Sequence, residues 1–336
     1  MELYILPQRV RVASIPRGSI RDFAHPLLRI AFYPTNDDFF CITATKDEYT
    51  LIIDDAQYKT LPQTDTLSVS KDTWRLLQLC EGDIGPADWI NKTGIVKSVT
   101  KPLAEANITI FYLSTYQNDF IMVPERLLEA AVIVLSKNYK VFDDSHTGDD
   151  YDEFGNSLVK KSDTTTVASA VQSEEAVLPA AAAPEAKKIH PVIVHDKHVY
   201  LACVPRDQLS SVALTLIELM LYSEEKDSAE NDDPMRHFFS FALVDNTISL
   251  VLDEESLARL PSTCNKSAVP YRVIQCYDGP LGFEESGIVA QFAEPLADNG
   301  VHIYYMSTFL TDYTLVVEDE IELAETTLRK TGHLKD

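Results

Sequence analysis

The chain has 336 residues, of which 45% are hydrophobic, and its formal net charge is −23. This length predicts two or more domains, each with an apolar core. The negative charge argues against a nucleic-acid binder and against docking on anionic membranes, because no basic stripe offsets repulsion from phosphate groups.

Strand and helix patterns alternate along the first half of the chain. Alternating β-branched and aromatic residues predict strands, and apolar residues spaced three and four apart predict helices. The first predicted group is a strand at 10–15, a helix at 20–32, strands at 39–45 and 49–54, and a short helix ending at 61. The second group is a strand at 74–79, a helix at 94–105, strands at 109–114 and 120–124, a helix at 125–136 and a strand at 139–142.

The second half of the chain repeats the first. "GIVKSVTKPLAEANITIFYLST", from Gly94, matches "GIVAQFAEPLADNGVHIYYMST", from Gly287, without a gap. "FFCITATKDEYTLIIDDAQYKTLP", from Phe39, matches "FFSFALVDNTISLVLDEESLARLP", from Phe238. Self-similarity over whole elements indicates an internal duplication, so the second half should form the same strands and helices.

Two segments interrupt the repeat. Residues 143–188 are acidic, rich in Ser and Thr, and end in an Ala/Pro run, which predicts a flexible linker. A regulated segment that carries phosphorylation sites is the alternative interpretation. The second copy also contains an acidic insertion, "EEKDSAENDD", which begins at Glu224 and predicts a surface loop.

The element order βαββαβ occurs twice in each half and is ferredoxin-like. We therefore expect an α+β fold of four tandem ferredoxin-like modules, arranged as an internal duplication of two module pairs. The predicted boundaries are 1–65 for module 1, 66–142 for module 2, 143–188 for the linker, 189–262 for module 3 and 263–336 for module 4.

The loop "LGFEESGIVAQ", at 281–291, predicts an anion site at the start of a helix. Gly282 and Gly287 permit close approach of a ligand to the backbone, and the free N–H groups at a helix N-terminus favour a carboxylate. Glu285, in this loop, and Asp312, in the hairpin "YMSTFLTDYTLV", would hold a cation. A ligand with both a carboxylate and a cation is an amino acid.

The first copy differs at the same positions. Trp89 replaces Gly282 and Lys92 replaces Glu285, so the sister cleft should be blocked and partly basic. The Ser-Thr-x-x-x-Asp pattern of both hairpins has a second explanation. Asp and Ser side chains bond nearby backbone, so the pattern also suits a turn without any ligand.

Several motifs resemble the CASTOR proteins, cytosolic arginine sensors built from four ACT modules. These motifs are "MELYILPQRVRV", "LSTYQNDF", "PLGFEESGIVAQ", "YYMSTF" and the His190-Pro191 pair, and the likeness covers nearly all of the chain outside the linker and the insertion. The resemblance implies one L-arginine bound between modules 2 and 4. The ligand contacts that it implies are Thr109, Ile110, His190, Gly282, Glu285, Ile288, Val289, Thr308, Phe309, Leu310, Thr311 and Asp312.

The resemblance also implies protein partners. Family members form homodimers and bind the GATOR complex upstream of TOR, and arginine releases that complex. Tyr116, Gln117 and Asp119 match the partner-facing residues of the family, whereas two acidic positions of that surface are Val269 and Gly300 here.

The residues favour no catalysis and no cofactor. No enzyme motif is present, and His190, His195 and His198 lack the Cys or Glu that would complete a metal site. Five scattered cysteines without a C-x-x-C pair, together with a start that does not fit a signal peptide, indicate the reduced cytosol. Two other functions stay open: a ligand-independent ACT scaffold, or an allosteric regulatory subunit of an amino-acid biosynthetic enzyme.

Overall fold

The computed structural model describes residues 2–33, 39–80, 94–143, 188–223, 233, 235–244, 246–276 and 279–335. Trp89, Lys92, residues 144–187 of the predicted linker (143–188) and residues 224–232 of the acidic insertion (224–233) lie outside these residues. The comparison of an open cleft with a blocked sister cleft therefore stays a prediction.

The strands and helices predicted for the first half are present, and the second half repeats them, except that no strand equivalent to β8 follows α10 in the described residues. The strands are β1 (Glu2–Pro16), β2 (Phe40–Ala44), β3 (Glu48–Asp54), β4 (Ser68–Val69), β5 (Trp74–Cys80), β6 (Phe111–Ser114), β7 (Asp119–Pro124), β8 (Lys140–Asp143), β9 (Val192–Pro205), β10 (Phe239–Val244), β11 (Thr247–Leu252), β12 (Asn265–Lys266), β13 (Tyr271–Cys276), β14 (Tyr304–Ser307) and β15 (Asp312–Val317). The α-helices are α1 (Ala24–Phe32), α2 (Asp55–Tyr58), α4 (Ile95–Glu105), α5 (Leu128–Leu135), α7 (Leu209–Leu221), α8 (Glu254–Ala258), α9 (Ile288–Asp298) and α10 (Ile321–Lys330). Short 3-10 turns are η1 (Arg17–Phe23), η2 (Glu125–Leu127), η5 (Arg206–Gln208) and η7 (Glu318–Glu320).

The sheet closes on itself. Within the described residues, twelve strands form a ring in the order β1-β5-β7-β6-β14-β15-β13-β9-β11-β10-β2-β3, and β3 returns to β1. Two long strands make this closure possible, because each pairs with a different neighbour along each half of its length. β1 pairs with β5 before Val10 and with β3 after it. β9 pairs with β13 up to Val199 and with β11 from Tyr200. Closure removes the exposed strand edges that an open sheet would present.

Two features of the sheet differ from the predicted elements. β1 begins at Glu2 rather than at residue 10. In a ferredoxin-like unit β8 would pair with β5, but here it pairs in parallel with residues 2–5 of β1, which lie between β8 and β5. The length of β1 is the physical reason, since its first half reaches into the group of strands that follows it.

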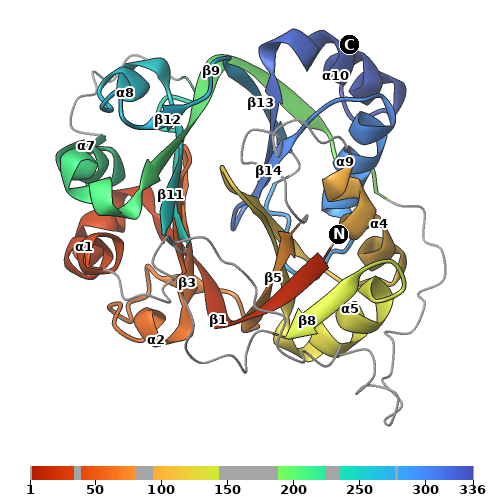
Figure 1. Cartoon of the computed structure of the whole chain (residues 1–336), viewed down its shortest axis with the longest axis horizontal. Helices are drawn as coiled ribbons and strands as arrows, with labels where there is room; N and C mark the ends of the chain where they lie inside the picture. The colour runs from red at the N-terminus through yellow and green to blue at the C-terminus, as the bar shows by residue number, and fades with distance from the viewer. Residues whose placement is uncertain are drawn as a thin grey trace.

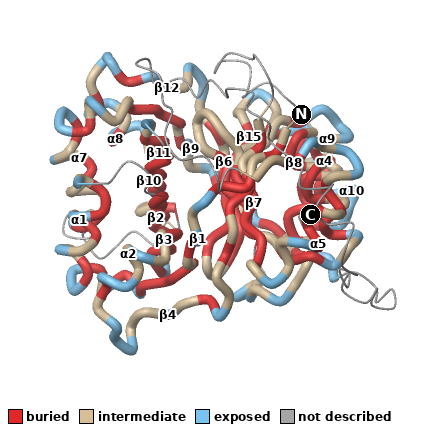
Figure 2. The backbone as a smooth tube through the Cα atoms, turned by 60° about the horizontal axis from the view of Figure 1, so that its bottom comes forward, coloured by how far each residue is buried: buried red, intermediate tan, exposed pale blue. Residues whose placement is uncertain are grey.

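Helices cover the outside of the ring in two groups. α1 and α7 lie side by side on one side, and α4, α5, α9 and α10 cover the other (Figure 1). Buried residues concentrate along the strands and on the helix faces that contact them (Figure 2). Among the described helices, none is both long and apolar enough to cross a bilayer.

Side chains along the strands point alternately into the ring and toward the helices outside it. The core is therefore divided between the inside of the ring and the two groups of helices. On β3, Tyr49 and Leu51 pack beneath α1 and α7, while Ile52 belongs to the cluster that fills the ring. Trp74, which is fully buried, lies in the same inner cluster. Burying a large apolar side chain contributes about 1.5–3 kcal/mol, so these clusters account for much of the stability.

The two copies meet along β6 and β14. Leu113 pairs with Met306, and the bonds on either side are reciprocal. The amide of Tyr112 donates to Ser307 Oγ and the amide of Tyr305 donates to Ser114 Oγ, each at 3.1 Å. α4 and α9 pack together above this seam. This near-symmetric contact brings the chain before β6 against the loop before α9.

Candidate ligand-binding site

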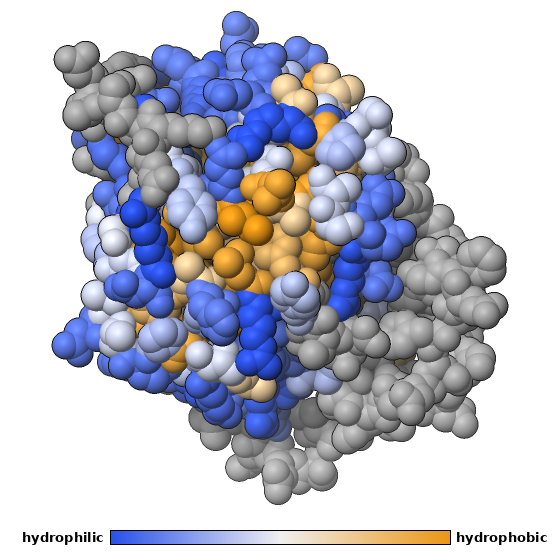
Figure 3. All heavy atoms as spheres, turned by 90° about the vertical axis from the view of Figure 1, so that its left-hand side faces the viewer, coloured by the Kyte–Doolittle hydropathy of each residue, from blue (hydrophilic) through white to orange (hydrophobic). Residues whose placement is uncertain are grey.

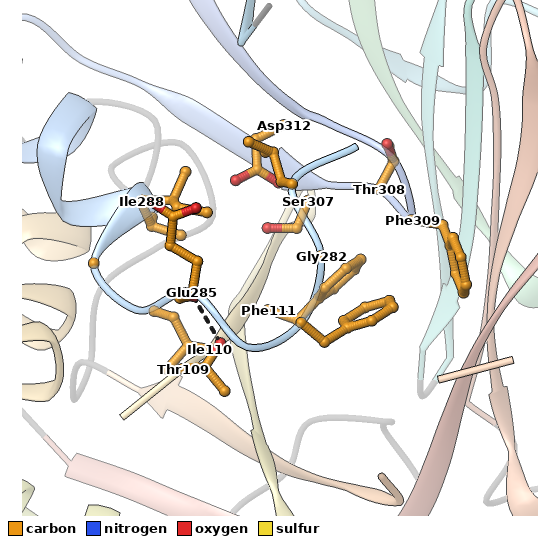
Figure 4. Close-up of a pocket in the computed structure, with 14 residues that line it drawn as sticks. Thr109, Ile110, Phe111, Gly282, Glu285, Ile288, Ser307, Thr308, Phe309 and Asp312 are labelled. Atoms are coloured by element: carbon orange, nitrogen blue, oxygen red, sulfur yellow. Dashed lines mark hydrogen bonds between the residues drawn. The ribbon is translucent and has the colours of Figure 1, made fainter. Parts of the chain in front are cut away.

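A pocket lies where the two copies meet, between the chain leading into β6, the loop before α9 and the β14–β15 hairpin (Figure 4). The pocket encloses about 30 Å³, and its space measures about 420 Å³ when the part that opens to solvent is included. The residues that line it are Thr109, Ile110, Phe111, Leu281, Gly282, Phe283, Glu285, Gly287, Ile288, Val289, Ser307, Thr308, Phe309 and Asp312.

Most of the predicted ligand contacts share this pocket. The nine that line it are Thr109, Ile110, Gly282, Glu285, Ile288, Val289, Thr308, Phe309 and Asp312. His190, Leu310 and Thr311 are not among the lining residues. They lie behind the walls and hold them, as the hydrogen bonds below describe.

Two glycines shape the loop before α9. Gly282 has a φ of 66° and Gly287 a φ of 85°, values in the left-handed region that favours glycine. Gly287 is the N-cap of α9 and provides no capping side chain. The first N–H groups of a helix have no partner within it and carry the positive end of its dipole. The start of α9 can therefore accept an anionic group.

Asp312 supplies a buried carboxylate at the first position of β15. Its side chain is 7% exposed, and Tyr305 Oη donates a hydrogen bond to Oδ2 at 2.8 Å. Burial raises the pKa of Asp312 to about 6, although the Tyr305 and Ser307 hydroxyls and the charge of His190 act in the opposite direction. Among the described residues, no Lys or Arg contributes to this shift. A cation that reached Asp312 would stabilise its ionised form.

Glu285 is held from two sides. Thr109 Oγ1 donates to the Glu285 carbonyl oxygen at 3.0 Å, which fastens the loop to the other copy. His190 Nε2 lies 2.7 Å from Glu285 Oε1, and the imidazole is completely buried. His333 Nδ1 in turn lies 2.8 Å from the His190 carbonyl oxygen. His190 therefore orients the glutamate from behind the pocket.

The tip of the β14–β15 hairpin is a turn held by its own threonines. Thr308 Oγ1 donates to the Thr311 carbonyl oxygen at 2.6 Å, and the Thr311 amide donates back to Thr308 Oγ1 at 3.2 Å. Thr311 Oγ1 also donates to the Cys276 carbonyl oxygen. The Leu281 amide donates to the Leu310 carbonyl oxygen at 3.0 Å, which joins the turn to the loop. Thr308 and Thr311 therefore hold this turn, whereas the Ser and Asp of the pattern bond Tyr112 and Tyr305. Thr308 also lines the pocket.

Five lining residues were not among the predicted contacts: Phe111, Leu281, Phe283, Gly287 and Ser307. Phe283 is the most informative of them, because its ring packs 5.0 Å from that of Phe309, 5.7 Å from that of Trp74 and 6.1 Å from that of Phe111. The sequence signal for Phe283 is an aromatic residue between Gly282 and two glutamates. A loop rarely keeps such a side chain exposed, so it could have been predicted to pack near the pocket.

The predicted partner-facing residues lie in the equivalent hairpin of the first copy and are half-buried. The Tyr116 amide donates to Ser249 Oγ at 2.9 Å, and Thr247 Oγ1 donates to Gln117 Oε1 at 3.4 Å. Burial raises the pKa of Asp119 to about 6, as it does for Asp312.

The other positions singled out in the sequence lie elsewhere. Val269 and Gly300 are both exposed. His195 bonds Gln275 at 2.9 Å and His198 bonds Glu318 at 2.9 Å. The two histidines are therefore part of the contacts around β9 and not of the pocket.

Comparison with known families matches each part of this architecture. The family model for the N-terminal domain of cytosolic arginine sensor for mTORC1 subunit 1 matches residues 9–67, and the ACT-like model for subunits 1/2 matches 190–267. The ACT domain model matches residues 69–137 and 269–330. Aspartate kinase from Synechocystis, a solved structure, covers 100% of this chain and 57% of its own at 13% identity and a TM-score of 0.33, too low to add to the assignment.

Curated relatives match over almost the whole length. Cytosolic arginine sensor for mTORC1 subunit 1 of Rattus norvegicus is 34% identical over 331 residues, which are 96% of this chain and 94% of that protein. The Homo sapiens protein of the same name is 32% identical over 330 residues, 96% of this chain and 95% of that protein. With this identity over this coverage, the chain belongs to the family of the cytosolic arginine sensors for mTORC1.

Proposed function

We propose that the protein is a non-enzymatic cytosolic arginine sensor that binds L-arginine in the pocket beside β6. The observation that carries the proposal is Asp312, a buried carboxylate without a described Lys or Arg partner, which lines the same pocket as the start of α9. The α-carboxylate of arginine would bind the free amides at the start of α9. Its guanidinium would pair with Asp312, because its planar fork suits a carboxylate. Glu285, oriented by His190, would hold the α-ammonium.

The proposed organisation is four ACT modules with the boundaries predicted from the sequence. The four segments matched by family models support this division. The arginine would then bridge modules 2 and 4, because Thr109 belongs to the second and Asp312 to the fourth. A ligand that contacts two modules favours the arrangement in which both contacts form, and so shifts the population of conformations.

A thermal-shift screen of the twenty amino acids, followed by calorimetry, tests this function. Arginine should raise the melting temperature, since ligand at 100 times its Kd stabilises the fold by about 2.7 kcal/mol. Asp312→Asn should weaken arginine binding by at least about 30-fold, because loss of one partner of a desolvated charge pair costs about 2–5 kcal/mol.

Asp119→Asn is the matched control, because Asp119 is the equivalent acid of the other hairpin and its pKa is also raised to about 6 by burial. Its Kd for arginine should stay within about threefold of the wild type. Unchanged binding in Asp312→Asn contradicts the assignment of the guanidinium. A shift with no amino acid favours the ligand-independent scaffold, and a shift with lysine alone together with a co-purifying catalytic subunit favours the regulatory subunit.

The proposed protein partner is a GATOR-type regulator of TOR signalling, contacted around Tyr116, Gln117 and Asp119. The support is the placement of this hairpin, which packs against β11 through Tyr116 and Gln117 while its side chains remain partly accessible. Movement between the two copies would therefore change the surface that the partner contacts.

The proposed assembly is a homodimer formed through α1 and α7. Leu214 on α7 is 84% exposed, and Tyr33 and Tyr222 at the ends of these helices are also exposed. Other apolar residues of the two helices that are only partly buried are Ala24, Leu28, Phe32, Ile217 and Leu219. Figure 3 shows this side of the molecule, where apolar side chains gather in a patch surrounded by polar ones. Such a patch is typical of a protein interface, and a second copy is the commonest partner.

A further inference from the structure

A buried carboxylate inside the ring holds the pocket hairpin from the far side. Glu48 is the first residue of β3 and is only 3% exposed. Thr50 Oγ1 donates to Glu48 Oε1 at 3.0 Å, and Ser14 Oγ, on β1, donates to Oε2. Burial raises the pKa of Glu48 despite these donors, and no Lys or Arg of the described chain contributes to the shift. A carboxylate without a cation is costly to bury, so its hydrogen bonds deserve an explanation.

The remaining donors come from the tip of the β14–β15 hairpin. The Leu310 amide donates to Glu48 Oε1 at 3.1 Å, and the Phe309 amide donates to Thr50 Oγ1 at 2.8 Å. Phe309 lines the pocket, and the Leu310 carbonyl oxygen accepts the bond from Leu281 in the loop. Thr50 therefore bonds Phe309 in the hairpin wall of the pocket. Glu48 bonds Leu310, which in turn bonds Leu281 in the loop wall.

The equivalent contact in the other copy has no carboxylate. The duplication places Thr247 at the position of Glu48 and Ser249 at that of Thr50. Ser249 Oγ accepts from the Tyr116 amide at 2.9 Å, as Thr50 does from Phe309. Thr247 Oγ1, in contrast, donates to Gln117 Oε1 and to the Val244 carbonyl oxygen, each at 3.4 Å. The charged acceptor thus occurs only where the hairpin lines the described pocket.

We propose that Glu48 and Thr50 are positioning residues for the ligand site. They fix the tip of the β14–β15 hairpin, so that Phe309 and the Asp312 that follows it face the pocket. Because both lie on β3, they also connect the pocket to the part of the ring that carries α1. The expected effect on arginine binding rests on the proposed function. The hydrogen bonds from Phe309 and Leu310 to Thr50 and Glu48 are present in the ligand-free protein.

Two substitutions remove the acceptors, and a third retains one. Glu48→Leu and Thr50→Val keep similar shapes without an acceptor, whereas Glu48→Gln keeps one for the Leu310 amide. The test measures hydrogen exchange at the Phe309 and Leu310 amides without ligand, and the Kd for arginine by calorimetry. Exchange should accelerate at Leu310 in Glu48→Leu and at Phe309 in Thr50→Val, and each should weaken arginine binding by about tenfold, equivalent to about 1.4 kcal/mol. Glu48→Gln should stay within about threefold of the wild type.

The double variant Thr247→Val with Ser249→Ala is the matched control. It should accelerate exchange at the Tyr116 amide and leave the arginine Kd unchanged. Wild-type Kd and wild-type exchange in Thr50→Val would overturn the proposal, as would an equal loss of binding in the control. If the wild-type protein binds no arginine, the proposed function fails. Hydrogen exchange at the Leu310 amide then still tests whether Glu48 holds the tip of the hairpin.

Discussion

Asp312 determines at which pH the pocket can bind a cation. Its folded pKa of about 6 lies above the about 3.9 expected in an unfolded chain. In the ligand-free protein this group therefore contributes most to stability below pH 4, and that contribution is lost as the pH rises through 6. Arginine reverses the preference, because its guanidinium stabilises the ionised carboxylate.

We expect arginine affinity to fall about tenfold between pH 7.5 and pH 5.0, since a carboxyl with a pKa near 6 is about one-tenth ionised at pH 5. Calorimetry in buffers of different ionisation enthalpy should show proton release on binding at the lower pH. The pH dependence that remains in Asp312→Asn measures the share of groups other than Asp312. Equal affinity at both pH values in the wild type would contradict a direct pairing with Asp312.

At the scale of the elements, the loop before α9 depends on a close backbone approach. Gly287 has a φ of 85°, and a Cβ there would lie 3.3 Å from the Cβ of Ala104 on α4. Gly94, at the equivalent start of α4, has a φ of 92°, but no atom of the described residues lies within 4 Å of the position that its Cβ would take. Substituting Gly94 therefore tests the backbone strain alone, whereas substituting Gly287 tests the strain together with the contact between helices.

Both Gly94→Ala and Gly287→Ala should reduce the free energy of unfolding, by about 1–2 kcal/mol for the positive φ alone. Gly287→Ala should lose more and should also weaken arginine binding by several-fold, because it moves the amides that face the pocket. Denaturant titration and calorimetry measure the two effects. If Gly94→Ala impairs binding as much as Gly287→Ala does, close packing of this loop is not the cause.

Local patterns were enough to predict the elements but not how distant ones meet. The pattern of apolar residues in β3 and in α9 lies within one short segment of sequence each, so the positions of these elements could be predicted. The pairing of β8 with β1 and the closure of the ring through β9 and β11 depend on strand lengths and on contacts far apart in the sequence.

The same limit applies to the candidate site. Gly282, Glu285 and Asp312 could be named from the loop and the hairpin, because each is a residue type with a specific use. Glu48 could not, because in "TKDEYT" it resembles an ordinary acidic residue of a surface turn. Its burial arises only when a hairpin some 260 residues later packs against it, as the separation of Glu48 and Leu310 shows.

At the scale of the whole molecule, the duplication produces two similar halves with different exposed faces. The helices beside the pocket, α4 and α9, cover each other, and their charges pair across the seam, as with Lys101 and Glu294 at 3.1 Å. α1 and α7 also pack side by side, on the opposite side of the molecule (Figure 1). Leu214 on α7 is exposed. An apolar face formed by α1 and α7 can build a closed dimer that leaves both pockets accessible, because a two-fold interface uses the same face of each copy.

Leu214→Glu should therefore convert a dimer into a monomer, because it places two charges in an apolar interface without partners. Sedimentation velocity measures the change in assembly, and arginine Kd should stay within about twofold, since the pocket lies on the other side of the ring. Leu323→Glu is the matched control, because Leu323 on α10 is 45% exposed outside the α1–α7 face, and it should leave the assembly unchanged. A wild-type protein that sediments as a monomer, or a Leu214→Glu protein that remains dimeric, would contradict dimerisation through α1 and α7. If dissociation also changes the arginine Kd, the two faces are coupled through β3, which lies between α1 and the Glu48 contact to the pocket hairpin.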